Sequence, residues 1–146
     1  MTSEMAVQRT ILIVEDDVAL RKAMREMLTL MGYRTVEAGS GARARNELAA
    51  HVPDLVCLDI ALPESSGIEL CEYIRSSPAH HNVRVLMMSD RVRPDDRAMA
   101  FESGADDYLP KPFSREGLHS RIQALLRSGP PSGTEGEGDP PCTRAS

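Results

Sequence analysis

The sequence has few aromatic residues, no excess of basic ones and no long apolar run. Its 146 residues include two Phe, three Tyr and no Trp, so the core must be built mainly from aliphatic side chains and Met. The formal net charge of -5 argues against direct binding to nucleic acid, because nucleic-acid-binding domains usually carry a basic surface. No apolar run approaches the roughly 20 residues that span a bilayer, and we expect no membrane contact.

Cysteine is scarce as well. Cys57, Cys71 and Cys142 have neither the paired spacing of a disulfide framework nor the spacing of a zinc site. The amino terminus has no basic segment followed by an apolar one, so the sequence predicts no signal peptide. A reduced, cytoplasmic protein is the simplest interpretation.

What the sequence does contain is an alternation of short apolar runs and amphipathic segments. Each of five apolar runs predicts a strand and is followed by apolar residues at the three- and four-residue spacing of a helix. This alternation indicates an α/β fold, a parallel sheet with helices on both faces. The predicted strands are 10–14, 33–38, 55–58, 83–88 and 105–109, and the predicted helices are 18–31, 42–50, 68–76, 94–102 and a last helix that begins after Ser114.

The chain length corresponds to one domain. We expect a flexible amino terminus over residues 1–8 and the folded domain over residues 9–128. From Gly129 the sequence is rich in Gly and Pro and has no apolar periodicity, which predicts a disordered tail over residues 129–146. The sequence leaves open whether this segment is a linker or simply a tail.

Polar side chains follow the ends of the predicted strands. Glu15 and Asp16 follow the first strand, Asp59 the third, Ser89 the fourth and Lys111 the fifth. In open parallel sheets, ligands bind beyond the carboxyl ends of the strands. Two unit charges about 4 Å apart interact with about 4 kcal/mol at an effective dielectric constant of 20. Carboxylates brought together there would favour a hard cation, Mg²⁺ or Mn²⁺.

Lysine and serine at the same edge suggest a phosphoryl group. A metal ion, the Lys111 ammonium and the Ser89 hydroxyl would together hold three oxygens of a phosphoryl group in transfer. Carboxylates are known nucleophiles for this chemistry and give an aspartyl phosphate. Asp59, alone at the end of the central strand, is the natural candidate for the nucleophile.

Four motifs occur in the order and spacing of a known family. They are Val14-Glu15-Asp16-Asp17, Leu58-Asp59 with Pro63 and Gly67, Met88-Ser89, and Tyr108-Leu109-Pro110-Lys111-Pro112-Phe113. Together with the (βα)₅ pattern, they make residues 10–127 resemble the receiver domain of two-component response regulators. The resemblance implies a doubly wound, five-stranded parallel sheet with the flavodoxin-like order 2-1-3-4-5.

The resemblance also assigns roles to the acidic residues. It implies that Asp59 is the phosphoacceptor and that Asp16 binds Mg²⁺ (or Mn²⁺) directly. Glu15 would be the acidic partner that acts largely through water, and the backbone carbonyl of Ala61 would be a further ligand together with Asp59.

For the switch, the resemblance implies that Ser89 and Lys111 contact the phosphoryl group. Tyr108 would turn inward as Ser89 moves, and the Lys111–Pro112 peptide would be cis. The expected partners are a sensor histidine kinase or phosphotransfer protein and a downstream protein that binds the face of the fourth helix, fifth strand and fifth helix. Such a domain is a switch that assists its own phosphotransfer and dephosphorylation, and not an enzyme.

Some positions leave alternatives open. Asp90 departs from the family pattern, which has a small residue after the serine, and allows a phosphorylation-independent interaction module on the same fold. A hydrolase or phosphatase with an Asp nucleophile would need a second carboxylate just past Asp59, where Ala61 stands. We interpret Asp17 as a helix-start residue rather than a third ligand, and His80-His81 as solvated.

Overall fold

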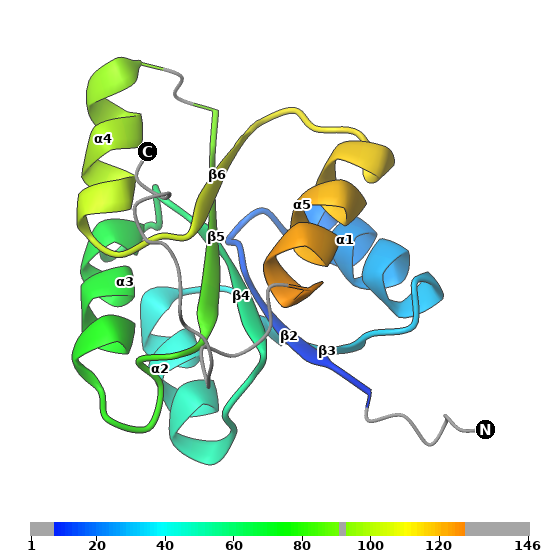
Figure 1. Cartoon of the computed structure of the whole chain (residues 1–146), viewed down its shortest axis with the longest axis horizontal. Coiled ribbons are helices and arrows are strands. Elements are labelled where there is room, and N and C mark those ends of the chain that lie inside the picture. The colour runs from blue at the N-terminus through cyan, green and yellow to red at the C-terminus, as the bar shows by residue number, and fades with distance from the viewer. Residues whose placement is uncertain (1–7, 91–92, 128–146) are drawn as a thin grey trace.

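The computed structural model describes residues 8–90 and 93–127, which form a parallel sheet between two layers of helices (Figure 1). The sheet has five strands in the order β3-β2-β4-β5-β6, and all neighbouring strands are parallel. Because β2 is the first strand along the chain, this order is 2-1-3-4-5 in chain order and confirms the prediction. The strands are β2 (Thr10–Val14), β3 (Arg34–Ala38), β4 (Leu55–Asp59), β5 (Arg84–Ser89) and β6 (Asp107–Pro110).

The two layers of helices are unequal. One face of the sheet is covered by α1 and α5, and the other by α2, α3 and α4 (Figure 1). Each predicted element is present, and its bounds differ from the prediction by two residues or fewer. The helices are α1 (Val18–Leu30), α2 (Gly41–Ala50), α3 (Gly67–Ser76), α4 (Pro94–Glu102) and α5 (Arg115–Arg127).

Alternate residues of the central strands enter two separate cores. In β4, Val56 and Leu58 face α2, α3 and α4, whereas Leu55 and Cys57 face α1 and α5. Because both faces of β4 are buried, its sequence is a continuous apolar run rather than an alternation. The edge strand β3 is only partly buried, which explains its weaker apolar pattern.

Helix caps set where α1 and α5 begin. Asp17 Oδ1 accepts hydrogen bonds from the backbone nitrogens of Ala19 and Leu20, so the interpretation of Asp17 as a helix-start residue is confirmed. Ser114 Oγ accepts a hydrogen bond of 2.9 Å from the nitrogen of Gly117 and caps α5, which begins after Ser114 as predicted. These caps fix the points at which the chain leaves the carboxyl edge of the sheet.

The prediction that His80 is solvated is wrong. The residue is only 6% exposed. Nε2 donates to the backbone oxygen of Leu48 at 2.8 Å, and Nδ1 lies 2.8 Å from Ser77 Oγ. Partners for both ring nitrogens remove the penalty for burying the ring. No local pattern indicates a partner that is 32 residues away in the sequence.

Two predictions fall outside the described residues. They concern residues 1–7 of the expected flexible amino terminus and the expected tail over residues 129–146, which contains Cys142. The other two cysteines, Cys57 and Cys71, are buried and free. Within the described ranges, no helix has the length and apolar character needed to cross a membrane.

Candidate functional site

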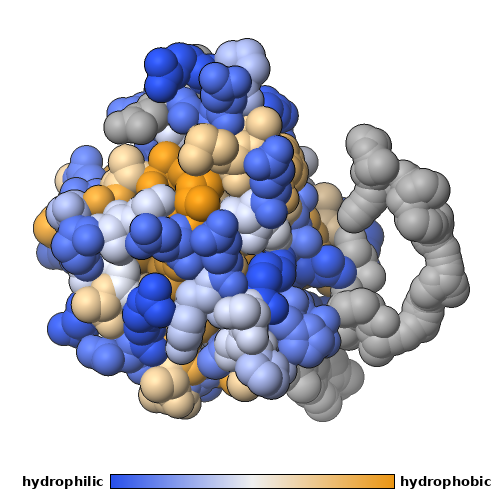
Figure 2. All heavy atoms as spheres, turned by 90° about the vertical axis from the view of Figure 1, so that its left-hand side faces the viewer, coloured by the Kyte–Doolittle hydropathy of each residue, from blue (hydrophilic) through white to orange (hydrophobic). Residues whose placement is uncertain are grey.

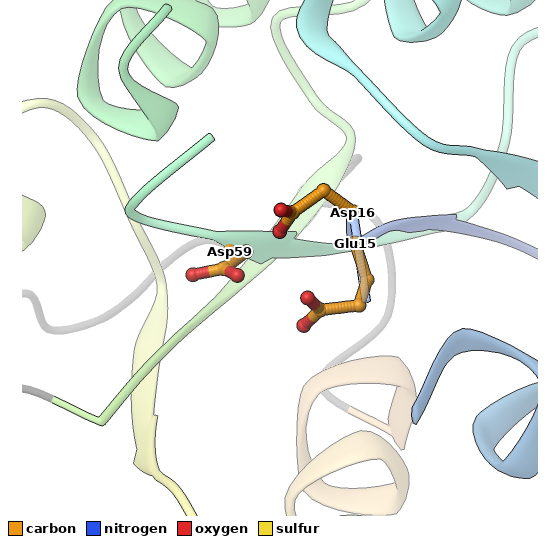
Figure 3. A group of neighbouring side chains, drawn as sticks. All are labelled: Glu15, Asp16 and Asp59. Atoms are coloured by element: carbon orange, nitrogen blue, oxygen red, sulfur yellow. The ribbon is translucent and has the colours of Figure 1, made fainter. Parts of the chain in front are cut away.

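Three carboxylates meet at the carboxyl edge of the sheet. Glu15 and Asp16 follow β2, and Asp59 ends β4. The two strands are neighbours in register, with Val14 opposite Leu58, so the residues that follow them must converge. One ligand oxygen from each of the three carboxylates lies within 4.8 Å of the others, and Figure 3 shows the three groups around a common space. Glu15 and Asp59 are buried, whereas Asp16 is exposed.

Lys111 brings an ammonium group to these carboxylates. Its Nζ lies 2.7 Å from Glu15 Oε1 and 3.0 Å from Asp59 Oδ2. Lys111 follows β6, and its backbone nitrogen donates to the oxygen of Ser89 at 2.8 Å, which anchors this turn to the end of β5. The peptide between Lys111 and Pro112 is cis, as the family resemblance implies.

Burial and charge act together on the titratable groups of the site. Burial raises the pKa of Glu15 above its usual value, although hydrogen bonds from Lys111 and the Asp17 nitrogen oppose the shift. Burial lowers the pKa of Lys111, but hydrogen bonds to Glu15 and Asp59 outweigh it and leave that pKa raised. Three ionised carboxylates and one ammonium leave a formal charge of -2, which one divalent cation would balance. Every side-chain atom that could bind such a cation here is a carboxylate oxygen, which suits Mg²⁺.

The loop after β4 is fitted closely around Asp59. Asp59 Oδ1 accepts a hydrogen bond of 3.1 Å from the nitrogen of Ala61. Gly67, the first residue of α3, packs against the backbone of Asp59, and a Cβ at Gly67 would overlap the carbonyl oxygen of Asp59. The nitrogen of Gly67 also donates to the oxygen of Ile60 at 2.9 Å. Only glycine permits this approach, so Gly67 determines how the loop returns to the site.

Ser89 and Tyr108 are both buried, with 1% of each residue exposed. Ser89 ends β5, the strand next to β4, and pairs with Pro110. The Tyr108 ring lies in the core shared with α2, α3 and α4, and the guanidinium of Arg97 lies 5.4 Å from its centroid. The Tyr108 side chain is therefore turned inward in this structure. Asp90, the unusual neighbour of Ser89, is exposed.

Sequence reasoning did not single out Arg21 or Glu64, which support this edge of the sheet. Arg21 Nη1 donates to the backbone oxygen of Glu15 at 2.8 Å. Glu64 Oε2 accepts a hydrogen bond of 3.3 Å from the nitrogen of Ala42. That hydrogen bond is the main reason that the pKa of Glu64 is lowered. The partners of both residues are distant in the sequence or on the backbone, so no motif indicates them.

Comparison with known proteins identifies the family. The model of the response regulator receiver domain matches residues 11–123. The chain belongs to this family. Receiver domains use Mg²⁺ at an acidic site, and Glu15, Asp16 and Asp59 form an acidic cluster in this chain. Membership also implies interaction with histidine kinases or phosphotransfer proteins.

Relatives with known names and structures agree. The chain is 40% identical over 127 residues to the response regulator MprA of Mycolicibacterium vanbaalenii, an alignment that covers 87% of this chain and 54% of that protein. A putative response regulator from Chloroflexus aurantiacus is 31% identical, with a TM-score of 0.79 over 83% of this chain and 99% of that chain. The BeF₃-activated DrrB receiver domain is 30% identical, with a TM-score of 0.75 and the same coverage. The chain spans about half the length of the curated relatives it matches.

Proposed function

We propose that this receiver domain is a switch operated by phosphorylation of Asp59. The observation that carries the proposal is the position of Lys111, whose Nζ joins Glu15 and Asp59 across the ends of neighbouring strands. A fixed ammonium beside a carboxylate nucleophile is the arrangement needed to stabilise negative oxygens in phosphoryl transfer. A relative supports the proposal too, because the DrrB receiver domain is activated by BeF₃, an analogue of the phosphoryl group.

The residues present fit a divalent cation. Asp16 and Asp59 would hold Mg²⁺ (or Mn²⁺) directly with the backbone carbonyl of Ala61, and Glu15 would act through water. The loop bond from the Ala61 nitrogen to Asp59 keeps Ala61 beside the carboxylates. When bound, the cation would neutralise charge that develops on the phosphoryl oxygens.

The transfer step uses the carboxylate of Asp59 as nucleophile. The incoming group is a phosphohistidine of a sensor histidine kinase or phosphotransfer protein. An Asp59 oxygen forms a bond to phosphorus as the phosphorus–nitrogen bond breaks, and the electron pair remains on the imidazole, which takes a proton from water. Lys111 and Ser89 then donate hydrogen bonds to the new phosphoryl oxygens.

The output surface is the face of α4, β6 and α5. Phosphorylation adds about -1.5 to -2 charges, and movement of Ser89 toward them biases a two-state equilibrium that includes Tyr108. On α4, Met99 and Phe101 are half exposed. Of this face, only α4 belongs to the side drawn in Figure 2, where hydrophobic side chains lie among hydrophilic ones. We propose a protein partner for this face, no direct contact with nucleic acid or membrane, and a cytoplasmic location.

The experiment is phosphorylation by acetyl phosphate with and without Mg²⁺, followed by intact-mass measurement. We expect the wild type to gain one phosphoryl group only with Mg²⁺, and Asp59→Asn to gain none. Asp54→Asn is the matched control, because Asp54 lies beyond the opposite end of β4 and accepts from the Thr10 nitrogen at 2.7 Å, a bond that Asn can keep. Labelling of Asp59→Asn would place the acceptor elsewhere.

The exposed Asp90 beside Ser89 supports a second candidate, a module that binds partners without phosphorylation. This candidate predicts no mass gain in the wild type and no binding of beryllofluoride. If Asp90 obstructs the donor, Asp90→Ala will restore labelling. A mass gain in the wild type excludes the second candidate as an account of the site.

A further inference from the structure

Arg21 on α1 connects the end of β2 with β3. Its Nη1 donates to the backbone oxygen of Glu15 at 2.8 Å, and its Nε donates to Glu37 Oε1 at 3.1 Å. The same Glu37 carboxylate pairs with Arg25 Nε at 2.9 Å through its other oxygen. Arg21 is largely buried, with 19% of its side chain exposed, whereas 42% of Arg25 is exposed. A planar guanidinium held at two points is a rigid strut, and one end of this strut is the Glu15 carbonyl.

That carbonyl belongs to the peptide that joins Glu15 to Asp16. The two adjacent carboxylates have different surroundings, since Glu15 is buried against Lys111 and Asp16 is exposed. Figure 3 shows that both nevertheless face the space in front of Asp59. On the other side of Glu15, its nitrogen donates to the oxygen of Ala38 at 3.1 Å. Rotation of the Glu15–Asp16 peptide would move the Asp16 carboxylate away from Asp59.

We infer that Arg21 is a positioning residue for the cation site, which it serves by holding the Glu15 carbonyl and so the direction of Asp16. The inference rests on the proposed function, because it concerns the metal that phosphorylation of Asp59 requires. Arg21 touches neither the cation nor the phosphoryl group in this arrangement. It acts through the backbone alone.

The turn after β3 is shaped around the same guanidinium. A Cβ added to Gly39 would lie 3.1 Å from Arg21 Nη1, closer than ordinary van der Waals contact. An alanine at this position would therefore press on the nitrogen that donates to Glu15. Gly39 thus offers a way to disturb the strut without changing any charge.

The charge of Arg21 and its contact with Glu15 predict opposite effects on Mg²⁺ binding when Arg21 is replaced. The positive charge of Arg21 lies near the proposed cation site and would repel Mg²⁺, so removal of this charge alone would strengthen Mg²⁺ binding. Loss of its hold on Glu15 would weaken binding. Arg25→Gln is the matched control, since it removes the same charge from the same Glu37 carboxylate and leaves the contact with Glu15 intact.

The test is a titration of the full chain with MgCl₂, followed by the amide NMR shifts of residues 15–17 and 59–61. For Arg21→Gln we expect the Mg²⁺ dissociation constant to rise about ten-fold, the lower end of the effect of outer-shell substitutions in metal sites. Arg25→Gln should bind Mg²⁺ as tightly as the wild type or more tightly. Arg21→Lys should recover part of the affinity, and Gly39→Ala should weaken binding less than Arg21→Gln.

A second measurement reports position without the metal. Amide hydrogen exchange of Glu15 and Asp17, both bonded in the wild type, should be faster in Arg21→Gln than in Arg25→Gln. Thermal unfolding of each variant shows whether it folds, and Arg21→Lys and Gly39→Ala carry the test if Arg21→Gln does not.

Two outcomes overturn the inference and are distinguishable. If the wild type binds Mg²⁺ and Arg21→Gln binds it as tightly as Arg25→Gln, Arg21 only attaches α1 to the sheet. If the wild type shows no saturable shift, the metal site of the proposed function fails, and the inference fails with it.

Discussion

The two ends of the sheet both carry clustered charge but treat it differently. At the amino end, Asp106 Oδ2 accepts hydrogen bonds of 2.6 Å from Arg75 Nη2 and 2.8 Å from the nitrogen of Val85, and Arg84 lies nearby. Arg75 also donates to the backbone oxygens of Gly104, His81 and Val83. At the carboxyl end, the ammonium of Lys111 pairs with two of three clustered carboxylates, those of Glu15 and Asp59.

The two clusters differ in charge balance. The protein itself pairs the charges at the amino end, whereas the charges at the carboxyl end are left unbalanced. The amino-end charges are satisfied by side chains and backbone of the protein, so they contribute to stability. The carboxyl-end carboxylates repel one another, and one ammonium leaves a net negative charge that a divalent cation from solution would balance. Residues of the same types thus stabilise the fold at one end and, in the proposed function, bind a ligand at the other.

The largest effect on stability should follow from removing a charge from the amino-end cluster. Asp106→Ala leaves Arg75 without its carboxylate and the Val85 nitrogen without its acceptor, so we expect the free energy of unfolding to fall by about 2–3 kcal/mol. Urea unfolding measures this loss. The exposed Glu102→Ala serves as a control and should stay within about 0.5 kcal/mol of the wild type. An equally small loss for Asp106→Ala would mean that its network contributes little.

At the other end, stability should depend on the concentration of divalent cation. With about 10 mM Mg²⁺ and a dissociation constant of about 1 mM, the free energy of unfolding should rise by about 1.4 kcal/mol. The measurement compares urea unfolding in MgCl₂ with NaCl of equal ionic strength after EDTA treatment. Asp16→Asn should lose this gain, and a gain that persists in that variant would place the bound cation away from Asp16.

Removing a carboxylate should therefore have opposite signs at the two ends. In EDTA, Asp16→Asn relieves repulsion with Glu15 and Asp59, and we expect a stabilisation of about 0.5 kcal/mol, because Asp16 is exposed and screened. Unfolding in EDTA at low and high salt checks the cause, since salt should shrink the gain. If Asp16→Asn is instead less stable than the wild type in EDTA, repulsion among the three carboxylates does not destabilise the protein.

The smallest effect concerns the chemical reactivity of Lys111. Its raised pKa means that its stabilising contribution is fully present below the ordinary lysine value of about 10.4 and is lost only as pH rises through the folded value. At pH 9, limited acylation with peptide mapping should therefore modify the exposed Lys22, the other lysine of the chain, before Lys111. Asp59→Asn should bring the acylation rates of Lys22 and Lys111 closer together. Equal modification in the wild type would contradict the geometry at Lys111.

The strand-end residues could be predicted because their positions follow from periodicity. Once five strand–helix units are recognised, Glu15, Asp59 and Lys111 must meet at one edge of a parallel sheet, and the structure brings them together. The roles of Ser89 and Tyr108 in switching, and of Ala61 as a ligand, stay predictions. Periodicity locates strand ends but does not describe movement.

The contacts that could not be predicted join side chains to distant backbone atoms. Arg21 reaches the oxygen of Glu15, Arg75 reaches that of Gly104, and His80 reaches that of Leu48. Every residue has a backbone oxygen, so the sequence around the acceptor carries no signal of its partner. Such contacts follow from how helices settle on the sheet, which depends on the whole packing and not on a motif.

The bond between Lys111 and Glu15 joins residues 96 positions apart, and the one between Lys111 and Asp59 joins residues 52 apart. A chain that lacks β6, or that has not yet added it to the sheet, cannot place the ammonium beside Asp59. Loop-closure entropy makes such long-range contacts slow to form. The contact between Lys111 and Asp59 therefore reports complete assembly of the sheet, because it can form only in a molecule that has added β6.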